Sequence, residues 1–215
     1  MATLMDTKRI VRTWCAALVA LIAAVWICIR WVDYPVAARF FHPSSEGGII
    51  GLIFGGRVLV AEELSLIGIL ALVRLKTGSL PDVAKTLLIA CSTSVMAYTL
   101  NDLVLKFAFG RQGPEAFYQS PLAGTFHFFQ GIDAASFPSG HMMLAAAFLG
   151  VFSRVYPRLR MASLSLLVFG TLVLVVGDWH FVSDVLAGTF LGFTAGLIAG
   201  ELWLRHTQSR STGQR

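Results

Sequence analysis

The chain has 215 residues, of which 56% are hydrophobic and only 13% are charged. A soluble domain carries about 25% charged residues, so this composition excludes an ordinary soluble protein and indicates a membrane protein. The formal net charge of +5 does not indicate a nucleic-acid-binding protein, because the basic residues are spread between apolar segments and form no single basic stripe.

Six apolar segments follow one another along the chain, each close to the roughly 20 residues that a transmembrane helix needs. Only helices and closed barrels satisfy their backbone within a bilayer, and the period-2 alternation of barrel strands is missing. We therefore predict an all-α polytopic membrane protein, a six-transmembrane-helix bundle formed by residues 1–204, followed by a polar, disordered cytoplasmic tail at 205–215. The predicted spans are 13–30, 58–75, 83–105, 139–154, 161–178 and 184–204.

Two stretches near the N-terminus need an interpretation of their own. The first apolar segment resembles a signal peptide, but it lacks a small-residue cleavage site and is predicted to be a retained first helix. The segment 31–57 is predicted to be a loop with a short interfacial helix. The three cysteines, Cys15, Cys28 and Cys91, lie inside apolar runs without the spacing of metal ligands, which favours packing over a disulfide or a metal site.

Charged residues predict the topology. With six spans both termini lie on one side, and most lysines and arginines fall on that side, which the positive-inside rule identifies as cytoplasmic. The histidines and aspartates at the ends of the later spans fall on the opposite side. Titratable groups gathered at one membrane face indicate a functional site there. The basic residues assigned to the cytoplasmic side are Lys8, Arg9, Arg12, Arg74, Lys76, Lys85, Arg154, Arg158, Arg160, Arg205, Arg210 and Arg215.

The stretch "SFPSGHMMLAAAFLG" at 136–150 predicts an anion-binding helix start. Pro138 interrupts the chain, Ser139 can cap the helix, and Gly140 permits close approach of the backbone. Free N–H groups at a helix N-terminus bind anions, and His141 in the first turn lies within reach of a bound anion. The structural alternative is an ordinary serine cap beside an interfacial histidine.

The stretch "GDWHFVSDVLAG" at 177–188 places His180 and Asp184 four residues apart, on one helix face. A carboxylate beside an imidazole fixes its tautomer and raises its basicity, so His180 could act as a nucleophile towards phosphorus. A structural His–Asp pair and a pair of metal ligands are the alternatives. Upstream, Lys106 and Arg111 could stabilise the negative charge of a phosphoryl transition state, or they could simply extend to lipid headgroups.

Together the three stretches resemble the motifs of the type 2 phosphatidic acid phosphatase (PAP2) superfamily, in particular its membrane-bound lipid phosphatases. The resemblance covers roughly 106–188. It implies that His180 is the nucleophile and forms a phosphohistidine, that Asp184 orients it, and that His141 protonates the leaving oxygen. It further implies no metal, no cofactor, and a phosphate held by Lys106, Arg111, Ser139 and the Gly140 backbone.

Two positions depart from the family pattern. Gly113 and Leu174 stand where phosphate-binding arginines are usual in the family. We expect Arg111, two residues before Gly113, to replace one of them.

The sequence favours a metal-independent phosphatase that hydrolyses a lipid phosphate or diphosphate monoester, with the site facing the periplasm or exterior of a bacterial inner membrane. Phosphatidic acid, phosphatidylglycerophosphate, polyprenyl diphosphate and lipid A phosphates are all candidate substrates. The alternatives are a non-catalytic headgroup-binding protein of the same fold and a metal or proton-coupled transporter that uses the same His and Asp residues. Glycines recurring every four residues from 188 to 200 predict close helix packing, within the bundle or in a homodimer.

Overall fold

A computed structural model describes residues 3–40, 55–115, 124–132 and 135–212. The regular secondary structure in these ranges is helical, which confirms the all-α prediction, and two isolated bridges join 111 to 126 and 112 to 135. The helices are α1 (Thr3–Ile27), α2 (Asp33–Phe40), α4 (Gly56–Thr77), α5 (Asp82–Leu100), α6 (Lys106–Phe109), α8 (Gly140–Val155), α9 (Arg160–Val176) and α10 (Val182–Thr212), with π-helical turns η1 (Cys28–Val32) and η2 (Asn101–Leu105) and a 3-10 turn η3 (Pro157–Leu159).

Each of the six predicted spans falls on a helix, but among the described residues only four stretches are long and apolar enough to cross a membrane by length and composition. They are Val11–Phe40, Asp82–Phe109, Pro157–Val176 and Val182–Ser209. Helix α8 has only 16 residues, about 24 Å of helix against a hydrocarbon core of about 30 Å. Helix α4 carries Glu62 and Glu63 between the basic residues at its two ends. The count of six spans is therefore not established.

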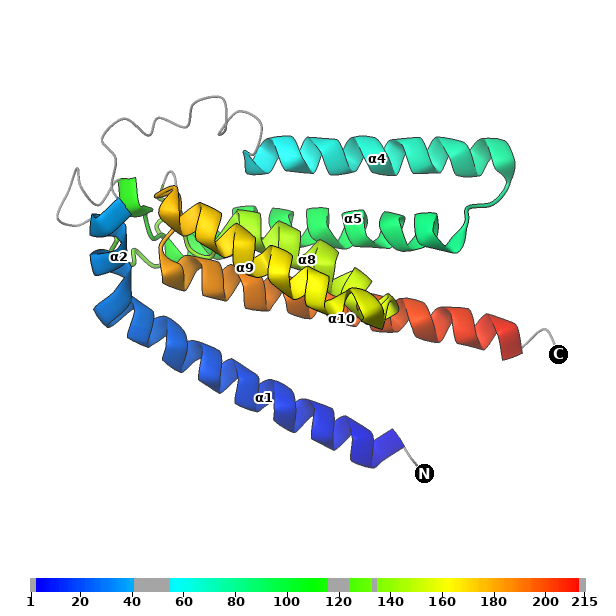
Figure 1. Cartoon of the computed structure of the whole chain (residues 1–215), viewed down its shortest axis with the longest axis horizontal. Coiled ribbons are helices and arrows are strands. Elements are labelled where there is room, and N and C mark those ends of the chain that lie inside the picture. The colour runs from blue at the N-terminus through cyan, green and yellow to red at the C-terminus, as the bar shows by residue number, and fades with distance from the viewer. Residues whose placement is uncertain (1–2, 41–54, 116–123, 133–134, 213–215) are drawn as a thin grey trace.

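Helices α8 and α10 run parallel at the centre of the bundle (Figure 1). The glycines of α10 lie directly against the α8 backbone, where a Cβ at Gly192 would stand 2.2 Å from the carbonyl oxygen of Met143. The same close approach recurs at Gly188, opposite Ser139, and at Gly196, opposite Ala147. The predicted small-residue face thus packs inside the bundle, and a homodimer remains a prediction that this face does not support.

Parallel packing brings the N-termini of α8 and α10 to the same end of the molecule (Figure 1). Each helix N-terminus carries a partial positive charge and N–H groups that lack helical partners. Helix α2 and the α9–α10 connection lie at this end, whereas both chain termini and the α4–α5 turn lie at the other. This separation agrees with the predicted topology, although the side of the membrane remains a prediction.

The outer helices expose apolar side chains that a bilayer would cover. Val19 and Ile22 on α1 are 67% and 60% exposed, and Phe169 on α9 is 64% exposed. The centre of α8, in contrast, is fully buried at Ala146, Ala147 and Val151. A tightly packed interior of small residues and an apolar outer surface are typical of helix packing in lipid.

Two predictions about segment ends need comment. The tail at 205–215 was expected to be disordered, but α10 continues to Thr212. Arg205 forms an i,i+4 ion pair with Glu201 at 2.7 Å, and Glu201 also binds Arg154 of α8, so the helix is anchored well beyond its apolar part. Within the predicted loop of 31–57, η1 and α2 continue helix α1 through Phe40, and α4 begins at Gly56. Residues 41–54 of that prediction lie outside the described residues.

Candidate active site

The connection between α9 and α10 delivers His180 to the end of the bundle. Helix α9 ends at Val176, and Asp178 adopts a left-handed conformation with φ 60° that turns the chain back. The backbone N–H groups of Trp179 and His180 both donate to the carbonyl oxygen of Leu174, at 3.0 and 3.3 Å. The turn is therefore held by main-chain bonds, and the imidazole of His180 is presented just before the first residue of α10.

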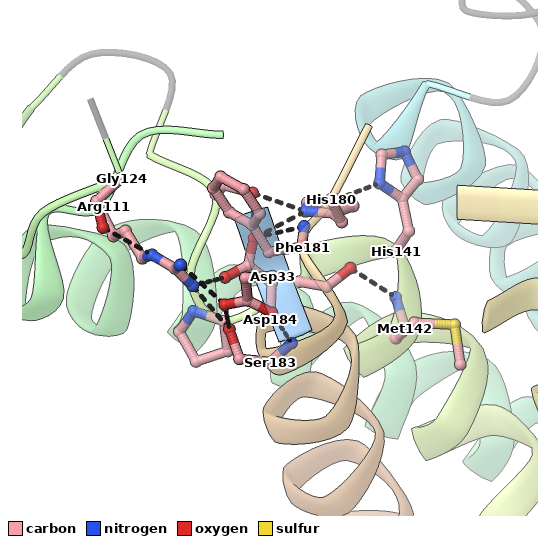
Figure 2. A network of polar contacts seen from close by, with 12 residues as sticks. Asp33, Arg111, Gly124, His141, Met142, His180, Phe181, Ser183 and Asp184 are labelled. Carbon is pink, nitrogen blue, oxygen red and sulfur yellow. Dashed lines mark hydrogen bonds and ion pairs between the residues drawn. The ribbon is translucent and has the colours of Figure 1, made fainter. Parts of the chain in front are cut away.

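His180 meets His141, the second residue of α8. The Nε2 atom of His180 lies 3.2 Å from Nδ1 of His141 (Figure 2). His180 is 9% exposed and His141 is half-buried, so the pair lies at the boundary between the packed interior and the surroundings. The structure thus brings together two of the predicted catalytic residues, which are 39 positions apart in the sequence.

Asp184 approaches His180 through a serine. The shortest distance from His180 Nδ1 to the Asp184 carboxylate is 3.8 Å, too long for a hydrogen bond. The hydroxyl of Ser136 fills the space, with Oγ 2.6 Å from Asp184 Oδ2 and 2.7 Å from His180 Nδ1. Ser136 is therefore a site residue that our sequence analysis missed. Its place at the start of "SFPSGH" gave no hint of a partner 48 positions away.

The serine determines which nitrogen of His180 carries the proton. An ionised carboxylate only accepts hydrogen bonds, so the Ser136 hydroxyl donates its single proton to Asp184. Ser136 Oγ must then accept from Nδ1–H of His180. The lone pair of this imidazole is consequently on Nε2, the atom that faces His141. A neutral histidine in this tautomer has its nucleophilic nitrogen directed away from the carboxylate.

Replacing Ser136 with alanine is expected to lower turnover about 10- to 100-fold, the effect of losing a hydrogen bond to a charged group worth roughly 1.5–3 kcal/mol. Because Asp184 still accepts from the Phe181 N–H, the fold should persist while His180 loses its fixed tautomer. Steady-state kinetics would measure the loss. Ser153→Ala, which removes an equally buried hydroxyl near the opposite end of α8, is the matched control. Unchanged turnover in Ser136→Ala would show that Asp184 acts on His180 without the serine.

Arg111 is fully enclosed, with an exposure of 0%. Its Nη1 donates to Asp184 Oδ1 at 2.8 Å and to Ser183 Oγ at 2.6 Å. Its Nη2 donates to Asp33 Oδ2 at 2.8 Å, and its Nε donates to the carbonyl of Gly124 at 3.0 Å (Figure 2). These contacts show Arg111 holding the far side of Asp184. Its predicted contact with a phosphate remains a prediction.

Aromatic rings hold the loop that carries Arg111 and Ser136. The guanidinium carbon of Arg111 lies 4.3 Å from the centroid of Phe181 and 5.3 Å from that of Phe126. Phe126 in turn packs edge-on against Phe137 at 5.3 Å, next to Ser136. Isolated antiparallel bridges from 111 to 126 and from 112 to 135 join the same loop segments through their backbones. The buried cation thus lies over two aromatic rings, a setting that suits guanidinium better than ammonium.

The remaining predicted site residues occupy the start of α8 and the end of α5. Ser139 is fully buried, accepts a hydrogen bond from the N–H of Met142 and donates its own N–H to the carbonyl of Asp184 at 3.0 Å. Gly140 lies so close to the Tyr98 ring that an added Cβ would be 3.1 Å from it. Lys106 is 23% exposed and pairs with Asp102 at 3.0 Å. The ion-pair partner of Lys106 is thus a residue outside the His180–Asp184 network.

The two departures from the expected motif have different surroundings. Leu174 packs in an apolar cluster with Met142 and Val185, so the position belongs to the core of this protein. Gly113 lies beside the site, where a Cβ would be 3.4 Å from Ser136 Oγ. In the part of the chain that the structure describes, no group of three or more His, Cys, Asp and Glu side chains is arranged to hold a metal ion.

Comparisons with known proteins identify a family and two relatives. The family model described as the PAP2 superfamily matches residues 86–207. Lipid A 1-phosphatase of Rhizobium johnstonii is 34% identical over 105 residues, which are 47% of this chain and 42% of the relative. Lipid A 1-phosphatase of Rhizobium etli is 34% identical over 116 residues, 53% of this chain and 49% of the relative. The chain thus aligns with less than half the length of each relative, and no solved structure matches it significantly.

The matched region begins in α5 and ends in α10, and it contains all three motifs as well as Ser136. It covers more than half of the chain. This protein is therefore a member of the PAP2 superfamily.

Proposed function

We propose that this protein is an integral-membrane phosphatase that hydrolyses a lipid phosphate or diphosphate monoester through a phosphohistidine on His180. One observation carries the proposal: Nδ1 of His180 is held through Ser136 to Asp184 while Nε2 faces His141 at 3.2 Å. A nucleophile held in one tautomer, with a second imidazole on its reactive side, is the arrangement that phosphoryl transfer through a histidine needs.

In the first step Nε2 of His180 attacks the phosphorus atom, and the bond from phosphorus to the lipid oxygen breaks. The electron pair of that bond goes to the leaving oxygen, which takes a proton from His141. Because a phosphoryl group has to enter between the two rings, their direct contact opens when substrate binds. His180 becomes a phosphorylated imidazolium, whose positive charge Asp184 stabilises through Ser136.

In the second step water displaces His180 from phosphorus. His141, now neutral, accepts a proton from the water as the new phosphorus–oxygen bond forms. The bond between nitrogen and phosphorus breaks with its electron pair returning to Nε2, and inorganic phosphate leaves. The sequence of steps restores both histidines and uses no other reactant.

Charge on the phosphate oxygens is stabilised by the positive ends of two helices and by Lys106. The N-termini of α8 and α10 converge on the histidine pair, so their N–H groups and dipoles favour an anion there. Lys106 reaches the phosphate by exchanging its exposed partner Asp102 for the substrate. Ser139 and the Gly140 backbone contribute at the start of α8.

The substrate is proposed to be a lipid whose apolar tail remains in the bilayer, at the membrane face opposite the termini. The exposed apolar helices next to the site support this class. Lipid A bearing a 1-phosphate is the first substrate to test, because two relatives that align with about half of this chain are named lipid A 1-phosphatases. A transporter would need its His and Asp ligands across the permeation path, whereas these residues lie where α8 and α10 begin.

The assigned roles are tested with two kinds of substrate. Purified protein is assayed, with chelator present, on a panel of lipid phosphates and on an aryl phosphate whose phenolate leaves without a proton. We expect chelator-resistant phosphate release. His141→Ala should lose about 10²- to 10⁴-fold on the lipid substrates and much less on the aryl phosphate, because only the former need a general acid.

His127→Ala is the matched control. It removes a histidine whose ring is hydrogen-bonded to the neighbouring Thr125, and it should retain activity on both substrates. Equal losses on both substrates in His141→Ala would contradict the acid role. Loss of release with chelator, restored by a metal ion, would contradict metal independence, and no release from any substrate by folded protein would contradict the proposed function.

A further inference from the structure

Asp33, the first residue of α2, is a buried carboxylate that the reaction described above does not use. It is 1% exposed and belongs to a part of the chain that precedes the region matched by the family model. Its carboxylate accepts three hydrogen bonds, from Arg111 Nη2 at 2.8 Å, from Ser183 Oγ at 2.6 Å and from the Ser183 N–H at 3.0 Å (Figure 2). A buried carboxylate needs such complete pairing to remain ionised.

The two partners of Asp33 are bonded to each other, and one of them, Arg111, holds the far side of Asp184. Nη1 of Arg111 donates both to Ser183 Oγ and to Asp184 Oδ1. A continuous hydrogen-bonded chain therefore runs from Asp33 through Arg111, Asp184 and Ser136 to Nδ1 of His180. Asp33 also accepts from an N–H in the first turn of α10, so it anchors the helix that carries Asp184.

Charge explains why a second carboxylate is useful here. Arg111 alone would neutralise Asp184 and leave the pair with no net charge. With Asp33 the three side chains carry one net negative charge, which matches the positive charge that develops on His180 when it is phosphorylated. In a buried site this charge is only weakly screened, so it contributes to stabilising the transition state.

We propose that Asp33 is a positioning residue of the active site, which sets the charge and geometry of Asp184 by sharing Arg111 with it. This inference rests on the proposed phosphatase function. The N-terminal helices then complete the catalytic machinery of the PAP2 region, and they do more than anchor it in the membrane.

The test is a pair of charge-changing substitutions studied singly and together. Asp33→Asn, which leaves the three side chains with no net charge, is expected to lower kcat about tenfold with KM unchanged, the effect of one nearby unit charge in a protein interior. Asp82→Asn removes an aspartate that likewise begins a helix, but its partner is the exposed Lys85, and it should leave kcat as in the wild type.

Arg111→Gln leaves two buried carboxylates without their shared cation, so it should be far less active and less stable than Asp33→Asn. Adding Asp33→Asn to Arg111→Gln restores a single negative charge. The double variant should therefore be about tenfold more active than Arg111→Gln alone and should melt at a higher temperature. A merely structural role for Asp33 predicts that the double variant is worse than either single one.

The outcomes separate this inference from the function on which it rests. A wild type that is inactive on every substrate would contradict both the proposed phosphatase function and the role of Asp33. An active wild type with an Asp33→Asn variant of normal kcat overturns only the role of Asp33. If Asp33→Asn alone does not fold, the double variant decides, since rescue relative to Arg111→Gln supports charge sharing and further loss refutes it.

Discussion

His180→Ala is expected to lower phosphate release from lipid and aryl phosphates alike by about 10⁴-fold or more, because the proposed nucleophile is removed. The alanine leaves Ser136 bound to Asp184, so the network behind it is preserved. His180 is partly accessible and carries no hydrogen bond that the helices depend on beyond its backbone bond to Leu174. Folding should therefore persist while catalysis is lost.

The decisive measurement is the amount of radioactive phosphate that remains bound to the protein. The protein is incubated with a labelled substrate and the reaction is quenched without acid. Wild-type protein should retain label that is stable in base and released in acid, as a phosphohistidine is, and His180→Ala should retain none. His206→Ala, which changes a histidine near the other end of α10, is the matched control. Label that persists in His180→Ala would identify a different nucleophile.

Arg111→Gln is expected to destabilise the folded protein by about 3–5 kcal/mol, the usual effect of removing one partner from a buried ion pair. The substitution leaves Asp33 and Asp184, both fully buried, without the cation that they share. Unfolding in detergent, followed by circular dichroism against denaturant, measures the change. Arg39→Gln alters an exposed arginine of α2 and should shift stability by no more than about 0.5 kcal/mol.

The same variant distinguishes two roles for Arg111. If it holds Asp184, as its contacts indicate, stability and kcat fall together. If it holds the phosphate, as the sequence predicted, KM rises while the protein remains stable. A stable Arg111→Gln protein with raised KM would therefore return the arginine to substrate binding and contradict the structural role proposed here.

The buried Arg111 and its two carboxylates also connect distant segments of the chain. The Asp33–Arg111 ion pair joins residues 78 positions apart, and the Asp33–Ser183 bond joins residues 150 positions apart. These polar contacts lie at the end of the bundle where α8 and α10 begin. They connect the first helical segment, the loop after α6 and the last helix at the site itself, while the glycine face of α10 fixes its distance from α8.

The sequence by itself determined the parts of this protein that local patterns encode. Runs of apolar residues between polar breaks predicted six helices, because an apolar segment in a bilayer or a packed bundle is stabilised as a helix that satisfies its own backbone hydrogen bonds. Short spacings also predicted His141, His180 and Asp184 as candidate site residues. His141 lies in the first turn of α8, as its position after Ser139 predicted, whereas His180 precedes α10 and reaches Asp184 only through Ser136.

Only the tertiary structure decided which residues complete the site. Ser136 bridges His180 and Asp184, and Asp33 shares Arg111 with Asp184, through contacts that span 44 to 150 positions. No periodicity records such contacts, since each depends on where separate helices meet. The polar composition of 205–215 likewise predicted a disordered tail, whereas α10 continues to Thr212 and is held at Glu201 by ion pairs with Arg154 of α8 and with Arg205. Local sequence patterns therefore predicted the helices and the candidate histidines, whereas the hydrogen-bond partners of those residues depend on how distant segments pack.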